Sequence, residues 1–404
     1  MQKGVRLYYL AGAADIASDY KTWKEKQSNA VSFGGGVFME QFFQFCHEID
    51  AHAKLVSTAD GTNLRAGRFT LEYRNPNPKG FAGLRYHLRL IGYMFGIMAS
   101  ITRFKPDLVL LGIAERYWFM LYIFYFSRIK FVPFLHCTLW PRMKSFDQLT
   151  LAQKFLFHLT GNFLEHRCEA VLAISDAIDS QISKITRHNG LKIFKFRPIY
   201  EPTLFNEISS PDWNQSPFRI IYVGRVEVNK GIYDLLKVAK LLKKRGGGEV
   251  FFDVCGTGDA LLDLRNAVRQ DSLVNIHIHG HCDRKRLSRL YSQCHAVIVP
   301  TTKDFPEGFN RVSIEAILCG RPVIISSAAI ESKIAAAALE VSPSDAGGFA
   351  NAIVELRDNR NTYERLCRGA VAAQEYFYDN DAGWENALRN IMIKAGGLTD
   401  VMRP

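Results

Sequence analysis

Short apolar runs alternate along the chain with longer segments whose apolar residues recur every three or four positions. We expect buried strands at 5–11, 53–57, 107–113, 130–136, 169–175 and 192–196, and again at 218–224, 249–256, 274–280, 295–300, 321–326 and 337–342. The segments between them, such as 232–245 and 283–294, have the period of amphipathic helices. Strands that are apolar on both faces and alternate with helices predict parallel sheets covered on each side, an α/β fold.

The alternation occurs twice, which predicts two doubly wound domains. Residues 201–217 separate the two sets, have no periodicity and contain several proline, serine and asparagine residues, so we interpret them as a linker. A chain of 404 residues is also too long for one ordinary core. We therefore expect domains at 1–200 and 218–384, with ligands beyond the carboxyl ends of the strands.

Positive charge is concentrated in the first half of the chain. Residues 1–200 contain 26 Lys and Arg against 15 Asp and Glu, whereas residues 201–404 contain 25 of each kind. The whole net charge of +11 therefore belongs to the first half. Such asymmetry indicates an anionic partner, which could be nucleic acid, a phosphate-bearing substrate or a membrane surface, or it serves solubility alone.

Two apolar segments of the first half are bordered by basic residues. Residues 90–101 and 118–126 are shorter than the roughly 18 apolar residues that span a bilayer. We expect buried helices there, although basic, aromatic-rich helices also occur on anionic membranes. The eight cysteines form no C-x-x-C pair and we find no secretory signal, so we expect free thiols in a reducing compartment, the cytoplasm.

Two glycine-containing turns follow strands of the second half. Gly224 ends one strand and is followed by Arg225 and Lys230, two cations suited to a diphosphate, although such residues are also common on surfaces. The second turn contains Gly256 and Gly258 but lacks the third glycine of a dinucleotide fingerprint, which disfavours a nicotinamide cofactor. Its glycines would let a nucleotide approach the strand end closely.

The stretch F-P-E-G-F-N-R-V-S-I-E places two acids around a helix start. Glu307 lies in a loop, Asn310 can cap a helix that begins near Arg311, and Glu315 lies about a turn inside that helix. Backbone N–H groups at the helix start carry partial positive charge. Two acids with a positive helix end suit a ligand that has hydroxyls at both ends and phosphates between them, a sugar nucleotide; otherwise they are ordinary solvated glutamates.

Taken together, these motifs resemble the donor domain of retaining GT-B glycosyltransferases of family 4. The matching motifs over 218–330 are V-G-R-x5-G, F-D-V-C-G-T-G, I-H-I-H-G-H, the E-x7-E pair and C-G-R-P-V-I. Residues 32–42 and 171–178 resemble, more loosely, the family's first glycine-rich loop and a strand-serine-helix ending. Asn310 departs from the pattern, because many members have glycine there.

The resemblance implies two Rossmann-like domains with a cleft between them, and a last helix within 385–404 that packs on the first domain. It implies that Arg225 and Lys230 hold and stabilise the leaving diphosphate, that Glu307 binds hydroxyls of the transferred sugar, and that His136 lies near the reacting carbon. The remaining donor-binding residues would be Gly35, Gly36, Gly224, Gly256, Gly258, His281, Gly308, Phe309, Asn310, Arg311 and Glu315, the last on the ribose.

The function implied is retaining transfer of a sugar from a UDP- or GDP-linked donor to a glycan or lipid-linked acceptor, in cell-surface polysaccharide or glycolipid synthesis. We expect no metal and no further cofactor, because the D-x-D at 379–381 precedes a helix and reads as a cap. We also expect attachment to the inner face of a membrane without spanning it. Alternatives are a sugar-nucleotide 2-epimerase of the same fold, a non-catalytic sugar-nucleotide-binding protein, and a nucleic-acid binder, although no nucleic-acid module is recognised.

Overall fold

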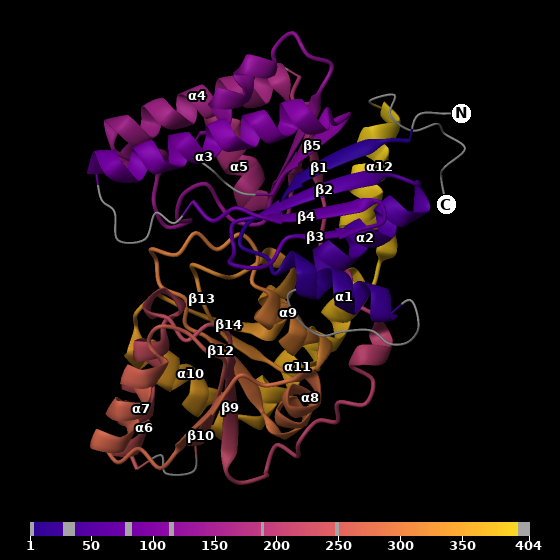
Figure 1. The fold of residues 1–404 in the computed structure, drawn as a ribbon. Helices are drawn as coiled ribbons and strands as arrows, with labels where there is room; N and C mark the ends of the chain where they lie inside the picture. Colours follow the sequence, from indigo (N-terminus) through magenta and orange to yellow (C-terminus); the bar gives the residue numbers. More distant parts are fainter. Residues whose placement is uncertain are drawn as a thin grey trace. The chain divides into compact units, whose positions relative to one another are not determined.

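The computed structural model describes residues 4–26, 37–76, 83–112, 117–186, 190–246 and 250–394. The chain divides into two compact units (Figure 1). The first comprises Met1–Leu139, Ser145–Pro198 and Asn380–Pro404, and the second comprises Trp140–Lys144 and Ile199–Asp379. The sequence placed the domain limits at 200, 218 and 384; it gave no indication that residues 140–144 group with the second unit.

The first unit is built on an eight-stranded sheet with the order β3-β4-β2-β1-β5-β6-β7-β8, parallel except for the pair β3–β4. Its strands are β1 (Arg6–Leu10), β2 (His52–Ser57), β3 (Leu64–Ala66), β4 (Phe69–Tyr73), β5 (Leu108–Leu111), β6 (Lys130–Leu135), β7 (Val171–Ala173) and β8 (Ile193–Lys195). Its helices are α1 (Ile16–Lys26), α2 (Val37–Glu48), α3 (Gly83–Phe104), α4 (Leu151–Arg167), α5 (Asp176–Ile185) and α12 (Trp384–Lys394). Because crossovers between parallel strands are right-handed, α1 and α2 cover one face, and α3, α4 and α5 cover the other (Figure 1).

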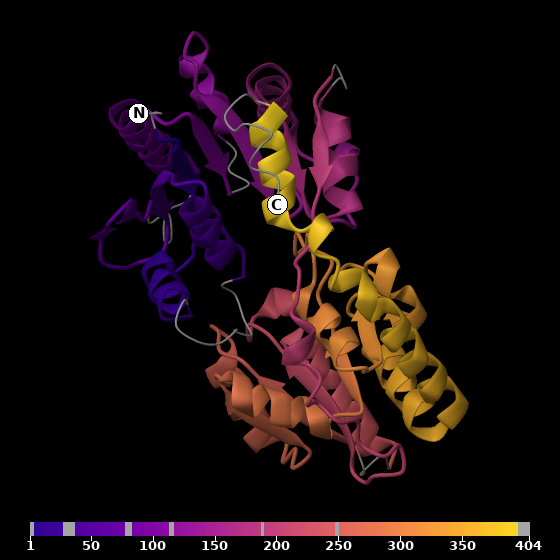
Figure 2. The ribbon, with the colours of Figure 1, turned by 90° about the vertical axis from the view of Figure 1, so that its right-hand side faces the viewer.

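The second unit is built on a six-stranded parallel sheet with the order β11-β10-β9-β12-β13-β14. Figure 2 shows its helices and strands, coloured mainly orange and yellow, from a direction turned by 90° from that of Figure 1. Its strands are β9 (Phe218–Val223), β10 (Val250–Cys255), β11 (Ile276–Gly280), β12 (Ala296–Val299), β13 (Val323–Ser326) and β14 (Ala338–Val341). Its helices are α6 (Ile232–Lys244), α7 (Leu261–Gln270), α8 (Arg284–Gln293), α9 (Arg311–Leu318), α10 (Ala346–Asp358) and α11 (Arg360–Gln374). Buried side chains of β9, β10, α6 and α10 form a continuous apolar core on one face of this sheet.

The predicted fold class is confirmed: both units are α/β with Rossmann-like parallel sheets, and all twelve expected strands are present. The hairpin β3–β4 was missed. In β4, Phe69 and Leu71 are buried while Thr70 and Glu72 are not, so this strand near the edge has an alternating pattern and not an apolar run.

The expectation of a buried helix at 118–126 is wrong in part. The segment forms a short 3-10 helix, η1 (Trp118–Phe124), whose Trp118 and Leu121 are buried, while Ile123 and Phe126 are exposed. The other apolar segment lies within α3, which is buried along one side only. Among the described residues, no helix has both the length and the apolarity needed to cross a membrane.

The last described helix, α12, packs on α2 of the first unit. Arg389 of α12 bonds Glu48 of α2 at 2.8 Å, and the Trp384 ring lies 6.1 Å from the Phe42 ring. Trp384 is fully buried. The carboxyl-terminal helix is thus part of the first unit although the second unit precedes it in sequence.

Candidate active site

Four loops of the second unit meet at one edge of its sheet. The strands β11, β10, β9 and β12 are neighbours and run parallel, so their carboxyl ends share this edge. The loops begin at Gly224 after β9, at Gly256 after β10, at His281 after β11 and at Pro300 after β12. These are the turns singled out from the sequence, and this is the edge at which doubly wound sheets bind ligands.

A close backbone contact at Gly231 holds the β9 loop against the β12 loop. Gly231 has a left-handed φ of 76°, and a Cβ there would lie 1.8 Å from the carbonyl oxygen of Pro300. Glycine is therefore required at this position. The backbone N–H of Thr302 also donates to the carbonyl of Asn229 at 3.0 Å. These contacts fix the basic loop beside the acidic one.

A lysine and a glutamate from these two loops form a shielded ion pair. Lys230 Nζ lies 2.7 Å from Glu307 Oε2 and 3.7 Å from the ring centroid of Phe305. The guanidinium carbon of Arg225 lies 5.8 Å from the same ring, and Arg225 bonds Glu227 at 2.8 Å. Cations attract the face of an aromatic ring, so Phe305 helps to hold both cations at one place.

Asn310 connects the acidic loop to the helix that follows. Its Oδ1 accepts a hydrogen bond from the Ser313 N–H at 2.9 Å, and its Nδ2 donates to Glu307 Oε2 at 3.2 Å. The expected N-cap of α9 is therefore confirmed. Glu307 itself is only 7% exposed. The residue that replaces the family's common glycine thus both begins the helix and orients the carboxylate.

The amino-terminal end of α9 lies directly after this carboxylate. Gly308 is buried, Phe309 is half-buried and Arg311 is the first residue of the helix. Free N–H groups of a first helical turn carry partial positive charge. Together with Lys230 and Arg225, the helix end gathers positive charge at this edge of the sheet, which is the arrangement that binds a diphosphate.

Glu315, the second acid of the E-x7-E pair, lies on the buried side of α9. The Tyr291 hydroxyl donates to Glu315 Oε2 at 3.4 Å, and Arg311 lies 3.8 Å from Oε1. Burial raises the pKa of Glu315, and the charge of Arg311 and the Tyr291 hydrogen bond oppose that rise. Tyr291 is fixed in turn, because its carbonyl accepts two bonds, at 3.0 and 3.1 Å, from the buried Arg321.

The glycines after β10 are required by the chain's own packing. A Cβ at Gly256 would lie 1.8 Å from the carbonyl oxygen of Gly224, and one at Gly258 would lie 2.4 Å from that of Val226. The loops after β9 and β10 could not otherwise lie side by side. A role of these glycines in admitting a nucleotide stays a prediction.

The histidines around the end of β11 differ in their surroundings. His281, predicted to bind the donor, is exposed. His279 lies 2.7 Å from the buried carboxylate of Asp253, which Arg219 binds with two nitrogens, and Arg286 lies 2.8 Å from the other ring nitrogen of His279. This network ties together β9, β10, β11 and α8, so it supports the sheet behind the loops.

Comparison with known proteins agrees with this geometry. The family model described as Glycosyl transferases group 1 matches residues 205–371. This match lies within the second unit and covers less than half of the chain.

Relatives and solved structures extend the likeness. A glycogen synthase of Mycobacterium tuberculosis is 23% identical over 261 residues, which are 61% of this chain and 58% of the relative. Sucrose-phosphate synthase of Thermosynechococcus elongatus superposes with a TM-score of 0.69 at 16% identity, covering 97% of this chain and 98% of that one. Anabaena HepE in complex with UDP-glucose gives a TM-score of 0.62 at 16% identity, covering 97% and 100%. These structures share the GT-B fold of the chain, and the fold expected from the resemblance is confirmed.

In the first unit of this GT-B chain, His136 directly follows β6 and is half-buried. Its ring lies 4.0 Å from that of Phe134 and 5.5 Å from that of Phe38, a residue of the first turn of α2. Burial lowers the pKa of His136 to about 4, and a hydrogen bond with the Gly112 backbone opposes the shift. The imidazole is therefore neutral at pH 7. Gly35 and Gly36, which precede α2, lie outside the described residues.

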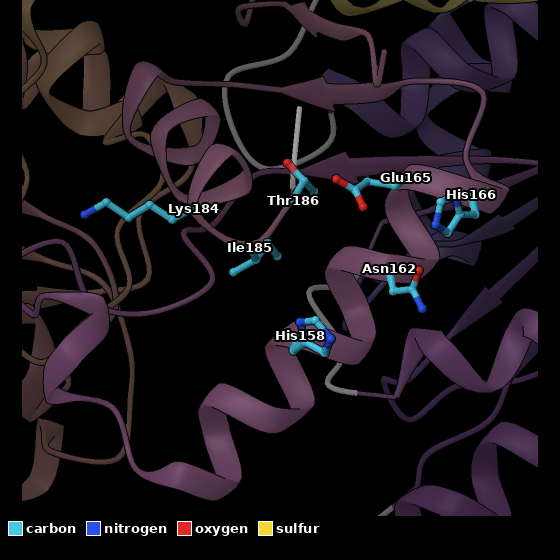
Figure 3. A pocket seen from close by; sticks show the side chains of 7 residues that line it. All are labelled: His158, Asn162, Glu165, His166, Lys184, Ile185 and Thr186. Carbon is cyan, nitrogen blue, oxygen red and sulfur yellow. The ribbon is translucent and has the colours of Figure 1, made fainter. Parts of the chain in front are cut away.

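Each unit also contains a cavity. Figure 3 shows one of about 480 Å³ between α4 and the end of α5, lined by His158, Asn162, Glu165, His166, Lys184, Ile185 and Thr186. Since α4 leads into the start of β7 and α5 ends far from the carboxyl end of that strand, this cavity lies at the edge where strands begin, opposite the ligand-binding edge. A second, of about 650 Å³, adjoins the β9 loop and is lined by Glu227, Val228, Asn229, Tyr233, Asp259, Ala260, Asp263, Thr302, Lys303, Asp304 and Ser344. Its four carboxylates would repel a diphosphate, and neither Lys230 nor Arg225 belongs to its lining.

Sequence reasoning missed three residues of this site: Phe305, Tyr291 and Arg321. The first had a usable signal, because an aromatic residue in the polar loop T-T-K-D-F-P-E is unusual for a solvated turn. Tyr291 and Arg321 had none, because a helix tyrosine and a C-G-R-P turn do not reveal what they touch.

We expect Asn310→Ala to lower the free energy of unfolding by about 2–4 kcal/mol, since it removes a helix cap, about 1 kcal/mol, and a buried bond to a charged group, about 1.5–3 kcal/mol. The matched control is Asn359→Ala. Asn359 caps α11 and also bonds a glutamate, Glu355, but on an exposed surface, so about 1 kcal/mol is expected. Urea unfolding measures both; equal losses would contradict the role of Asn310 on Glu307.

We also expect His136 to make the fold acid-sensitive. Its folded pKa of about 4 lies below the ordinary value of 6.5, so the unfolded chain binds more protons between these values. Stability is thus lost as the pH falls from about 6.5 to about 4, by at most about 3.4 kcal/mol. His136→Gln should flatten this part of the curve relative to wild type, whereas His158→Gln, at an exposed position, should not; parallel curves for wild type and His136→Gln would show the prediction wrong.

Proposed function

We propose that this protein is a retaining glycosyltransferase that moves a sugar from a UDP- or GDP-linked donor to a glycan or lipid-linked acceptor. The observation that carries the proposal is the placing of Lys230 and Arg225 over one ring, beside the start of α9 and Glu307. The family match over 205–371 and the UDP-glucose complex of the structurally similar HepE support a nucleotide-sugar donor.

The chemistry follows from where charge develops. Breaking the bond between the anomeric carbon and the diphosphate leaves positive charge on the sugar and negative charge on the departing phosphates. Fixed cations aimed at the leaving group stabilise that charge without reorganising during the reaction. Lys230, held by Glu307 and Phe305, is already in place, and Arg225 is more exposed and can turn toward the phosphates.

Glu307 and Glu315 would bind the two sugar rings of the donor. We assign hydroxyls of the transferred sugar to Glu307 and the ribose to Glu315. Within the described residues, Lys230 and Asn310 both bond Oε2 of Glu307, so its Oε1 can accept bonds from a sugar. The resemblance of the E-x7-E pattern supports the retaining outcome, in which the acceptor enters on the face that the diphosphate leaves.

We propose that neither a metal nor a further cofactor takes part. Two side-chain cations and a helix end can neutralise the leaving group. Within the described ranges, no three His, Cys, Asp or Glu side chains gather as metal ligands would. The D-x-D motif lies around η7 (Asn380–Ala382), directly before α12.

The acceptor is proposed from charge. All the net positive charge lies in residues 1–200, which suits an acceptor that bears phosphate. We therefore favour a lipid-linked glycan in cell-surface polysaccharide or glycolipid synthesis, and a place on the cytoplasmic face of a membrane. The alternative of a 2-epimerase predicts an epimerised nucleotide sugar, and a non-catalytic binder predicts no product.

The decisive experiment removes the two cations. Arg225→Ala and Lys230→Met should each lower turnover by about 10²–10³-fold, the loss typical of one charge-stabilising donor. Turnover is measured as nucleotide release from a panel of nucleotide sugars in excess EDTA, in which wild-type activity should persist. The controls Lys237→Met and Arg245→Ala remove cations of the same unit away from this edge and should keep wild-type rates.

Lys230→Met also leaves Glu307 buried beside no cation, which costs about 3–5 kcal/mol in buried pairs. The double variant Lys230→Met/Glu307→Gln removes both charges and should recover much of that stability while remaining inactive. Wild-type turnover in the Arg225 variant, or in the stable double variant, would refute the proposed mechanism.

Substitutions of Glu307 and Glu315 should have different effects on turnover and on nucleotide affinity. Glu307→Gln keeps the side-chain shape and should lower kcat by about 10²-fold while leaving nucleoside diphosphate affinity nearly unchanged. Glu315→Gln should weaken that affinity about 10-fold, as expected for one hydrogen bond to a charged group. Calorimetry with UDP and GDP measures the affinities; the reverse pattern would mean that the ligand lies in the opposite direction.

A further inference from the structure

Helix α3 exposes an apolar stripe on the surface of the first unit. Leu84 is 74% exposed, Leu88 56% and Phe95 58%. With Gly92 and Ala99, also exposed, they lie at intervals of three and four residues and so form one face. A surface helix ordinarily presents polar side chains to water, so an apolar face that is exposed to water is unusual.

Three arginines accompany the stripe. Arg85, Arg89 and Arg103 are exposed, and at 100° per residue they lie along one flank of it. The 22 residues of α3 include no aspartate or glutamate. The opposite face, with Leu90, Met94, Ile97 and Ile101, is buried and attaches the helix to its unit. The stripe is therefore presented outward on a helix that is already anchored.

A second apolar and basic element adjoins the first. His87 of α3 contacts the Tyr117 hydroxyl just before η1, and Tyr122 within η1 donates to the Asn162 carbonyl of α4 at 3.2 Å. At the far end of η1, Ile123 is 70% and Phe126 98% exposed. Arg128 follows and is also exposed.

We propose that α3 and the end of η1 form a membrane-docking face that lies on an anionic bilayer surface. Its leucines, isoleucine and phenylalanines would enter the boundary between head groups and acyl chains, and its arginines would meet lipid phosphates. The inference rests on the proposed function in one respect: a protein that lies on the bilayer surface can reach a lipid-linked acceptor there.

The positive charge and the apolar side chains of this face together favour an anionic bilayer as its partner. Nucleic acid would match the arginines, but exposed leucine and phenylalanine side chains gain nothing from a phosphate backbone. A second copy of the same face would match the apolar stripe, but its arginines would oppose arginines of equal charge. An anionic bilayer satisfies both features, and among the described residues no helix could span it.

The test is co-sedimentation of the full chain with vesicles of phosphatidylcholine alone and with phosphatidylglycerol added, at low and high salt. The stripe variant is Leu84→Ser/Leu88→Ser/Phe95→Ser, and the flank variant is Arg85→Gln/Arg89→Gln/Arg103→Gln. Their controls alter equally exposed residues of the second unit: Leu262→Ser/Val274→Ser/Val371→Ser, and Arg245→Gln/Arg365→Gln/Arg368→Gln.

Wild type and both controls should bind the anionic vesicles and release them as salt rises. The flank variant should bind about 100-fold more weakly, since each basic residue at such a surface contributes about 1 kcal/mol. The stripe variant should bind at least about 10-fold more weakly, and acyl-chain burial predicts that its loss is independent of salt. Nucleotide-sugar turnover in solution should be unchanged in both variants, which separates this proposal from the proposed function.

Three results would overturn the proposal: failure of wild type to bind anionic vesicles at low salt, wild-type binding by both α3 variants, or equal losses in the second-unit controls. Stronger binding of wild type to duplex DNA than to the vesicles would also overturn it, in favour of a nucleic-acid partner. Dimerisation that the stripe variant abolishes, without vesicle binding by wild type, would assign the face to a second copy.

Discussion

The site depends on a shielded ion pair between side chains that are 77 residues apart in sequence, Lys230 and Glu307. Removing an ammonium and a carboxylate from water costs several kcal/mol for each ion, and their attraction offsets this only when geometry and further hydrogen bonds are good. The structure supplies both. Asn310 bonds the same carboxylate oxygen, Phe305 lies under the ammonium, and Gly231 lets the two loops touch.

The sequence predicts most of this fold because strands buried on both faces of a parallel sheet leave long apolar runs, and each run was found as a strand. Local motifs also predicted the basic turn, the acidic loop and the cap of α9. What it could not predict are contacts between distant segments. Nothing near Phe305 shows that two cations lie over its ring, and nothing near Tyr291 shows that it meets Glu315.

Strand-end glycines illustrate why a motif can be located correctly and still be explained incompletely. From sequence, Gly256 and Gly258 indicate room for a nucleotide. In the structure, the space beside each is filled by the carbonyl groups of Gly224 and Val226. The glycines are needed before any ligand is considered, since parallel neighbouring loops could not otherwise pack. Their presence alone is therefore weak support for a nucleotide, and the charged groups of the adjoining loops carry more of the argument.

The two acids of the E-x7-E pair are equally buried but electrostatically unlike. Glu307 has a full cation at 2.7 Å and an amide donor at 3.2 Å. Glu315 has a hydroxyl at 3.4 Å and a guanidinium at 3.8 Å, and burial raises its pKa. Glu307 therefore holds the Lys230 ammonium in one position. Glu315 is less completely paired, so a neutral diol can gain more from it than from Glu307. That difference fits the proposal that Glu307 binds hydroxyls of the transferred sugar while it holds Lys230, and that Glu315 binds the ribose.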